Sequence, residues 1–184
     1  MCIRDRVKTA LKKKAVSNNK MLILCGDIPL IKSTSIKRII NKLKIYDAVV
    51  GTVELESPKG YGRIIRVNNK FNSIIEEKET TASQRLIKEV NTGIIAIHEK
   101  VLREYISKIK NNNQKKEYYL TDIIKILVDN NKKVSTFKFG NELEVAGVNS
   151  KTDLVNLEQR YLRQKAENLL ESGTLIRDPA RTDI

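Results

Sequence analysis

Cysteine is scarce in this 184-residue chain: Cys2 and Cys25 lie far apart and lack the spacing of paired metal ligands. Neither a disulfide framework nor a zinc site is therefore indicated, and the composition suits a reducing cytosol. No apolar run is long enough to span a bilayer, and no hydrophobic region follows the basic N-terminus as it would in a signal peptide. We expect a cytoplasmic protein with no membrane partner.

Aromatic residues are also scarce, at 5% with no tryptophan, which matters because the formal net charge is +13. Clustered lysines would release counterions from a nucleic-acid backbone. Here, however, lysine is spread through every segment, and the densest run, Lys12-Lys13-Lys14, falls on a predicted helix face. With little to stack on bases and no zinc-finger or RNA-binding motif, the composition disfavours a nucleic-acid partner.

The chain lacks any stretch with the composition of a linker, so one domain is expected, and 40% apolar residues are enough for its core. Residues 1–6 carry no pattern that continues into the neighbouring sequence. We expect them to be a leader foreign to the fold, with residues 7–184 forming the domain.

The order of predicted elements favours an α/β fold with a mixed, mostly parallel sheet. A helix at 7–16, a buried strand from Met21, a helix from Ser33 and a strand at 46–53 give the alternation of a parallel sheet. The strand at Met21 is expected to be parallel because its short apolar run is typical of a strand buried on both faces.

Between residues 60 and 78 the apolar period changes to two, which predicts a β-hairpin that turns at Asn68-Asn69-Lys70. The remaining expected elements are a short helix at 82–88, a strand at 93–97, helices at 99–109 and 120–130, strands at 134–139 and 143–148, and a helix at 152–172.

Asp27 stands just past the carboxyl end of the strand at Met21. In open α/β sheets ligands bind outside those strand ends, so a carboxylate there is a candidate for holding a metal that holds a phosphate. The structural alternative is that Asp27 caps the helix near Ser33 or closes a turn with Pro29, and this short stretch alone favours that alternative.

Other polar residues have structural interpretations as well. Tyr119, Thr121 and Asp122 stand where a helix begins, and Asn149 with Ser150 precedes the last helix, where both can act as caps. His98, the only histidine, has no sequence partner and is interpreted as a surface or cap residue.

Seven motifs occur in one order along the chain. They are Leu24-Cys25-Gly26-Asp27-Ile28-Pro29-Leu30-Ile31, Tyr61-Gly62-Arg63-Ile64, Ile75-Glu76-Glu77-Lys78, Glu89-Val90-Asn91-Thr92-Gly93-Ile94, Glu117-Tyr118-Tyr119-Leu120-Thr121-Asp122, Glu144-Val145-Ala146-Gly147-Val148-Asn149 and Asp178-Pro179-Ala180-Arg181. From about Val7 onward, the chain thereby resembles the uridylyltransferase domain of the bacterial bifunctional N-acetylglucosamine-1-phosphate uridylyltransferase and glucosamine-1-phosphate acetyltransferase.

The resemblance implies a Rossmann-like nucleotidyltransferase domain that joins UTP and N-acetylglucosamine 1-phosphate into UDP-N-acetylglucosamine, a cell-wall precursor, with release of pyrophosphate. It implies that Asp27 and Asn149 bind Mg²⁺. The residues that it implies for the nucleotide-sugar site are Cys25, Gly26, Gly62, Glu76 and Asn91, with Tyr119 and Thr121 on the sugar side.

These residue types suit that chemistry. Mg²⁺ prefers hard oxygen ligands and keeps several waters, so one carboxylate, one amide oxygen and substrate phosphates make a suitable shell. In-line attack of the sugar phosphate needs positioning and charge neutralisation, and it needs no protein nucleophile.

The chain also departs from the family pattern. Cys25 stands where an aromatic or another small residue is expected, and Ala146 where an acidic residue is usual. The Gly-rich loop and the uracil-reading segment that open the family's domain do not occur before Met21, and no hexapeptide repeat of the acetyltransferase follows. We expect an internal fragment, inactive by itself, of an enzyme that forms homotrimers through the absent β-helix.

The sequence leaves two alternatives open. In the first, the parent enzyme uses another base or sugar phosphate, because the base is recognised mainly by the missing segment. In the second, the chain is a noncatalytic, basic Rossmann-like binding module that associates with nucleic acid.

Overall fold

The computed structural model describes residues 3–12, 19–113 and 115–181, and within them the chain divides into two compact units. The first unit comprises residues 1–25 and 32–140, and the second comprises 26–31 and 141–184. The elements, in chain order, are α1 (Ile3–Lys12), β1 (Lys20–Ile23), α2 (Ser33–Lys42), β2 (Ala48–Glu54), β3 (Arg63–Val67), β4 (Lys70–Ile75), the 3₁₀ helix η1 (Glu77–Glu79), α3 (Ala82–Arg85), β5 (Glu89–His98), α4 (Glu99–Tyr105), η2 (Ile106–Lys108), α5 (Asp122–Asp129), β6 (Val134–Lys138), η3 (Glu142–Val145), α6 (Lys151–Glu171) and η4 (Pro179–Arg181).

The first unit is built on a mixed sheet in which β5 is central. The strand order is β4-β3-β5-β2-β6, and β1 also pairs with β5. Of these pairings only β2 with β6 is parallel; β5 runs antiparallel to β1, β2 and β3, and β3 runs antiparallel to β4. The expectation of a mostly parallel sheet is therefore wrong, although the α/β class and the mixed character are confirmed.

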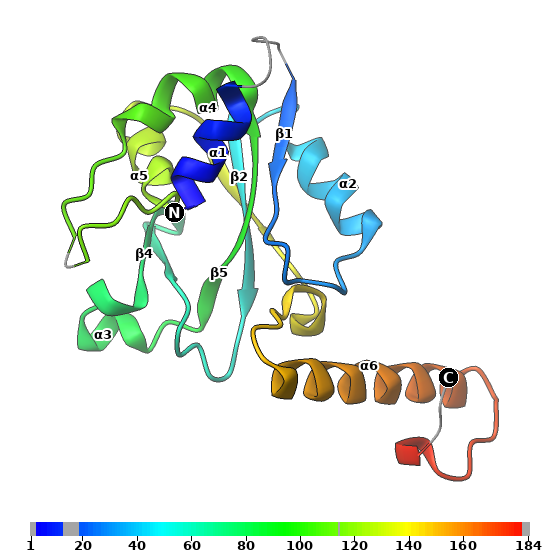
Figure 1. Ribbon diagram of the computed structural model, residues 1–184. Coiled ribbons are helices and arrows are strands. Elements are labelled where there is room, and N and C mark those ends of the chain that lie inside the picture. The colour runs from blue at the N-terminus through cyan, green and yellow to red at the C-terminus, as the bar shows by residue number, and fades with distance from the viewer. Residues whose placement is uncertain (1–2, 13–18, 114, 182–184) are drawn as a thin grey trace. The chain divides into compact units, whose positions relative to one another are not determined.

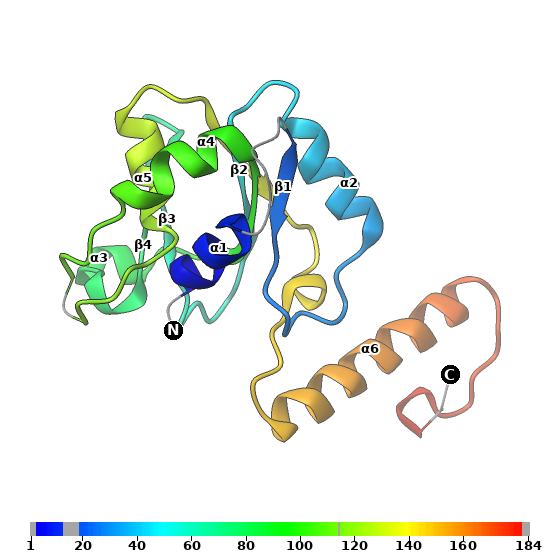
Figure 2. The same cartoon turned by 45° about the horizontal axis from the view of Figure 1, so that its top comes forward.

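Helices on both faces of the sheet explain that error. Figure 1 shows β2 and β5 between α5 on one side and α2 on the other. One core joins Ala48, Val50, Ile95 and Ile97 to side chains of α1, α4 and α5, and Figure 2 shows α1 beside α4 over this face. Because strands covered on both faces are apolar throughout, their sequences do not reveal their direction.

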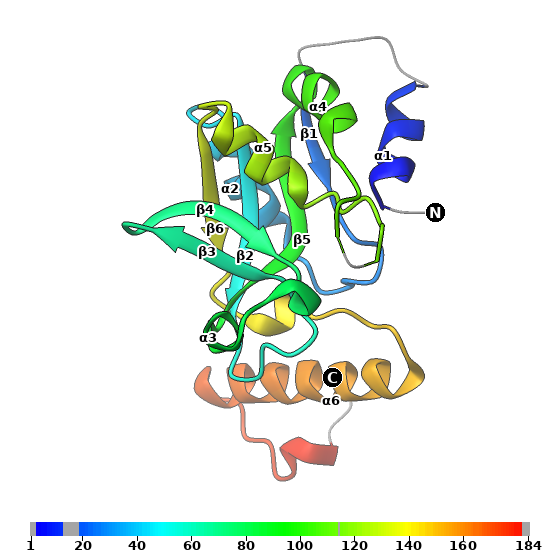
Figure 3. The ribbon, with the colours of Figure 1, turned by 90° about the vertical axis from the view of Figure 1, so that its left-hand side faces the viewer.

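The β3–β4 hairpin forms as its turn residues predict. Asn68 and Asn69 both have positive φ, of 50° and 60°, as a two-residue type I′ turn requires. Figure 3 shows the hairpin projecting from the rest of the sheet with its turn at the tip. Its other end leads into η1, next to Glu76, which the family resemblance implies for the nucleotide-sugar site.

Two other elements differ from expectation. Helix α1 begins at Ile3, within the segment expected to be foreign, and the end of the expected helix, 13–16, lies outside the described residues. Residues 143–148 form no strand: η3 occupies Glu142–Val145, because the Asn141 side chain accepts a hydrogen bond from Leu143 N at 2.9 Å and starts a 3₁₀ turn instead.

Candidate functional site

Asn91 and Gly93 form an irregular step in β5. The register between β2 and β5 shifts between Val50 and Thr52, and Gly93 lies opposite that shift with φ of +77°. The side chain of Asn91 accepts a hydrogen bond from Gly93 N at 3.1 Å. A bulge of this kind re-aims side chains, and it explains why glycine follows the asparagine so closely.

Cys25 lies against this bulge. A Cβ atom added to Gly93 would stand 2.8 Å from Cys25 Sγ, closer than real Cβ contacts. The missing side chain at Gly93 therefore makes the room that the cysteine occupies. The departure from the family pattern at Cys25 thus lies beside Gly93, whose N–H donates to Asn91, a residue of the same predicted site.

Gly62 and Glu76 lie next to the same strand. Asn91 N donates to the Gly62 carbonyl at 2.9 Å, and a Cβ atom at Gly62 would stand 3.6 Å from Glu76 Oε2. Glu76 in turn accepts a hydrogen bond from Thr121 Oγ1 at 2.7 Å. Cys25, Gly62, Glu76, Asn91 and Thr121 therefore form a continuous group, which we call the β5 cluster.

Thr121 does not act as the helix cap that its position suggests. It precedes α5, but its side chain makes no capping hydrogen bond and reaches Glu76 instead. Glu76 lies one residue past the end of β4, so this bond joins the hairpin to the start of α5. Thr121 therefore begins the helix, as its sequence position suggests, but its hydroxyl bonds to Glu76 and caps no backbone N–H of α5.

The charge around Glu76 extends to the start of α5. Burial, together with the charges of Glu76 and Glu79, raises the pKa of Asp122 to about 6. Burial also raises the pKa of the Tyr119 hydroxyl, with a contribution from the Glu117 carboxylate. The carboxylates of Glu76 and Glu79 thus act on Asp122, near the residues that the family resemblance implies for the sugar side.

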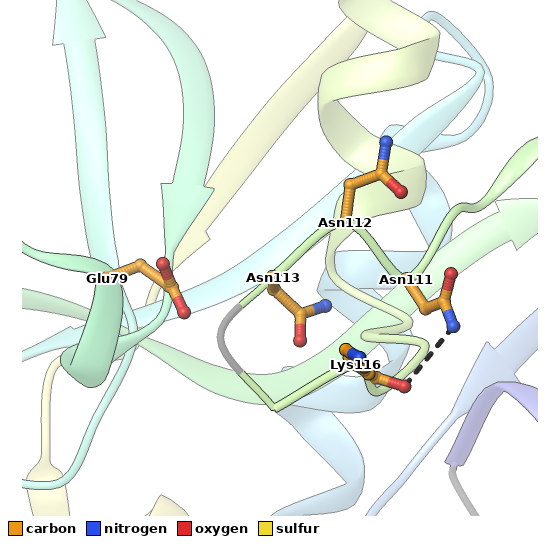
Figure 4. Close-up of a pocket in the computed structure, with 5 residues that line it drawn as sticks. All are labelled: Glu79, Asn111, Asn112, Asn113 and Lys116. Carbon is orange, nitrogen blue, oxygen red and sulfur yellow. Dashed lines mark hydrogen bonds between the residues drawn. The ribbon is translucent and has the colours of Figure 1, made fainter.

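A pocket of about 530 Å³ lies next to this region (Figure 4). Glu79 lines it together with Asn111, Asn112, Asn113 and Lys116. The loop is held locally, since Asn113 accepts a hydrogen bond from Glu117 N at 3.1 Å and Asn111 donates to the Lys116 carbonyl at 3.4 Å. The sequence predicted no helix or strand between residues 109 and 120 and no part of a site there.

In the second unit, the structure brings Asp27 and Asn149 together. A Cβ atom at Gly147 would stand 3.5 Å from Asp27 Oδ2 and 3.7 Å from Asn149 Nδ2, so both side chains flank this glycine. Val148 N donates to the Asp27 carbonyl at 2.8 Å and holds the two segments in this register. Rotation of the Asn149 amide would present its oxygen on the same side, so the pair can offer two oxygen ligands.

Asp27 and Asn149 also had structural interpretations, as cap or turn residues. The N-cap of α2 is Lys32, so Asp27 does not cap that helix, although it does lie in a turn with Gly26. The cap of α6 is Ser150, whose hydroxyl accepts from Asp153 N at 3.1 Å. Asp153 also accepts from Asn149 N at 3.1 Å, and this bond lowers the pKa of Asp153.

Gly26, the remaining predicted residue, is exposed, and a Cβ atom there would meet no described atom within 4 Å. Its backbone is therefore open to close approach. His98, interpreted from the sequence as a surface or cap residue, occupies the N-cap position of α4, and its Nε2 lies 2.8 Å from the Leu43 carbonyl.

Within the described residues there is no group of three or more His, Cys, Asp or Glu side chains that would form an all-protein metal site. No helix in that part of the chain is long and apolar enough to cross a membrane. The pair of Asp27 and Asn149 would thus need further ligands from outside the protein to complete a metal shell.

Comparison with known proteins identifies relatives that match most of this chain. No family model matches the chain. The bifunctional protein GlmU of Nitrosomonas europaea is 41% identical over 165 residues, which are 89% of this chain and 36% of that protein. GlmU of Ruthia magnifica is 40% identical over 166 residues, 90% of this chain and 37% of the relative. The chain is a GlmU homologue over this region. It spans a little more than a third of the length of these relatives.

The fold agrees with that relationship. A Bacillus anthracis structure described as a putative glucose-1-phosphate thymidylyltransferase matches 98% of this chain and 65% of its own chain, with a TM-score of 0.60 and 16% identity. At that identity the likeness shows the fold alone, an α/β fold of the sugar nucleotidyltransferase kind. It supports the fold that the family resemblance predicts.

One residue of the β5 cluster's surroundings was not singled out from the sequence. Arg63 belongs to one of the seven motifs, yet its role is seen only in three dimensions, where it is almost completely buried beside Gly62. The sequence signal that could have identified Arg63 is the presence of an arginine within a short apolar strand.

Proposed function

We propose that the chain takes part in Mg²⁺-dependent transfer of a uridylyl group from UTP to N-acetylglucosamine 1-phosphate, and that it carries sugar-binding and metal-binding residues for that reaction. The observation that supports this best is the homology to GlmU together with the pairing of Asp27 and Asn149 around Gly147. These two residues are remote in sequence, and the bond from Val148 N to the Asp27 carbonyl brings their segments together.

Each group has a distinct proposed task. Asp27 and Asn149 would hold Mg²⁺ through a carboxylate and an amide oxygen, and the ion would neutralise charge on the substrate phosphates. Glu76 and Asn91 would orient sugar hydroxyls or the acetamido group, with Thr121 fixing the Glu76 carboxylate. Cys25 and Gly26 would line the nucleotide side, where the open backbone of Gly26 permits close approach.

The reaction requires no covalent bond between the protein and its substrates. A phosphate oxygen of the sugar 1-phosphate attacks the α-phosphorus of UTP, the bond from that phosphorus to the bridging oxygen breaks, and pyrophosphate leaves. Binding the acceptor in a fixed orientation converts an encounter of two substrates into a pre-aligned displacement. The β5 cluster is suited to this role because its polar groups are held by strands and by the start of α5.

A chimera tests the proposal. The 165 matched residues of Nitrosomonas europaea GlmU are replaced by those of this chain, and pyrophosphate release is measured with UTP and N-acetylglucosamine 1-phosphate. We expect turnover within about tenfold of the unmodified relative, and a loss of roughly a hundredfold on Asp27→Asn in the chimera. Turnover with dTTP and glucose 1-phosphate in preference to these substrates would overturn the proposed specificity, and a folded chimera with no turnover would overturn the proposed role.

A further inference from the structure

Arg63 is the largest side chain that the first unit buries almost completely, at 2% exposure. It opens β3, directly after Gly62. Arginine is rarely buried unless its charge is paired, because taking a guanidinium out of water is costly. The position therefore calls for an explanation beyond the filling of space.

The guanidinium joins three segments around the β5 cluster. Nη1 forms an ion pair with Glu77 Oε2 at 2.7 Å and also donates to the Tyr61 carbonyl, while Nη2 donates to the Arg85 carbonyl at 3.5 Å. Tyr61 and Glu77 are the chain neighbours of Gly62 and Glu76. Arg63 thus contacts the chain neighbours of two members of the β5 cluster, Gly62 and Glu76.

The network leaves buried polar atoms unsatisfied. Among the described residues, Arg63 Nε and Glu77 Oε2 are buried without a hydrogen-bond partner, so the contact of Arg63 with Glu77 is an ion pair that lacks hydrogen-bond geometry. A buried ion pair is often matched or exceeded in stability by apolar side chains of similar volume. An apolar pair at positions 63 and 77 would fill the same space, but it could not fix the Tyr61 and Arg85 carbonyls.

We propose that Arg63 is a positioning residue for the sugar-binding side of the site, and that it acts through Glu77 and the Tyr61 carbonyl to fix Glu76 and Gly62. This inference rests on the proposed function, because Glu76 is assigned to the sugar there and Gly62 lies beside Glu76. Because Arg63 is almost completely buried, we assign it no direct contact with the substrate.

The test is a calorimetric titration of UDP-N-acetylglucosamine with Mg²⁺ into the 184-residue chain, with the melting temperature measured on each variant. Arg63→Met should weaken binding about tenfold or more and lower the melting temperature. Arg63→Lys, which keeps a charge for Glu77 but loses the forked contacts to two carbonyls, should bind with intermediate affinity.

The double variant Arg63→Met, Glu77→Leu separates positioning from stability. It replaces the whole ion pair, so the melting temperature should recover towards wild type while the affinity stays about tenfold weaker. Arg66→Met is the matched control. Arg66 lies on the same strand and pairs with Glu89 at 2.7 Å, and because neither residue belongs to the β5 cluster, its loss should leave binding unchanged.

Affinity that recovers together with the melting temperature in the double variant would overturn the inference about Arg63 and leave the proposed function intact. Absence of binding by the folded wild-type chain would instead overturn the proposed function, and the inference with it.

Discussion

Thr121 donates a hydrogen bond to Glu76 across 2.7 Å, although it occupies the position before α5 where threonine would ordinarily cap the helix. The bond connects the end of the β3–β4 hairpin to the start of a helix that comes much later in the chain. It gives the Glu76 carboxylate a hydrogen-bond partner outside its own hairpin.

A double-mutant cycle on Thr121 and Glu76 should measure that contact. Thr121→Val and Glu76→Ala should show a coupling free energy of about 1 kcal/mol in urea denaturation, since each single change removes the same hydrogen bond. Thr121→Ser keeps the hydroxyl and serves as the control. Strictly additive losses would mean that the two side chains do not interact in solution.

The contact between Gly93 and Cys25 gives a second prediction. Gly93→Ala should lower the free energy of unfolding by about 2 kcal/mol or more, because alanine disfavours the positive φ and its Cβ meets Cys25 Sγ. In a Cys25→Ala background only the backbone cost, about 1 kcal/mol, should remain. Equal losses in both backgrounds would show that the sulfur makes no steric contact with the bulge.

Asp122 should make stability depend on pH. Its pKa is raised to about 6, first by burial and then by Glu76 and Glu79. An aspartate in an unfolded chain has a pKa of about 3.9. The folded chain therefore holds this proton more tightly, and stability falls as the pH rises from about 4 to above about 6.

Asp122→Asn removes that dependence. As the pH rises from about 4 to about 7, the free energy of unfolding of the variant should increase by about 1 kcal/mol relative to that of wild type. This figure is reduced for the partial exposure of the carboxyl. Asp129→Asn, which changes a surface carboxylate paired with Lys125, is the control. A stability difference that does not vary with pH would refute the assignment.

Local features of the fold were predictable from the sequence because short-range chemistry determines them. The Asn68-Asn69 turn and the amphipathic α2 follow from turn conformation and apolar spacing. The pairing of Asp27 with Asn149 followed only from the family resemblance, since no local pattern relates two segments so far apart.

Features that depend on the tertiary environment were not predictable in this way. Burial on both faces hides strand direction, so β5 was placed in a mostly parallel sheet when it runs antiparallel to three neighbours. The apolar residues 143–148 suggested a strand, but the Asn141 side chain starts a 3₁₀ turn there. The Arg63 network joins β3, η1 and α3, and no single one of these segments reveals it.

The most direct test of a metal-dependent nucleotide-sugar site in this chain is calorimetric titration of UDP-N-acetylglucosamine with and without Mg²⁺. Wild type should bind with Mg²⁺ and lose about tenfold or more in affinity when EDTA removes it, because Asp27 and Asn149 would hold the phosphates through the ion. Asp27→Asn should bind weakly in both conditions, and Asp129→Asn should behave as wild type. Affinity that is the same with EDTA, or unchanged in folded Asp27→Asn, would contradict the assignment of Asp27 as a metal ligand.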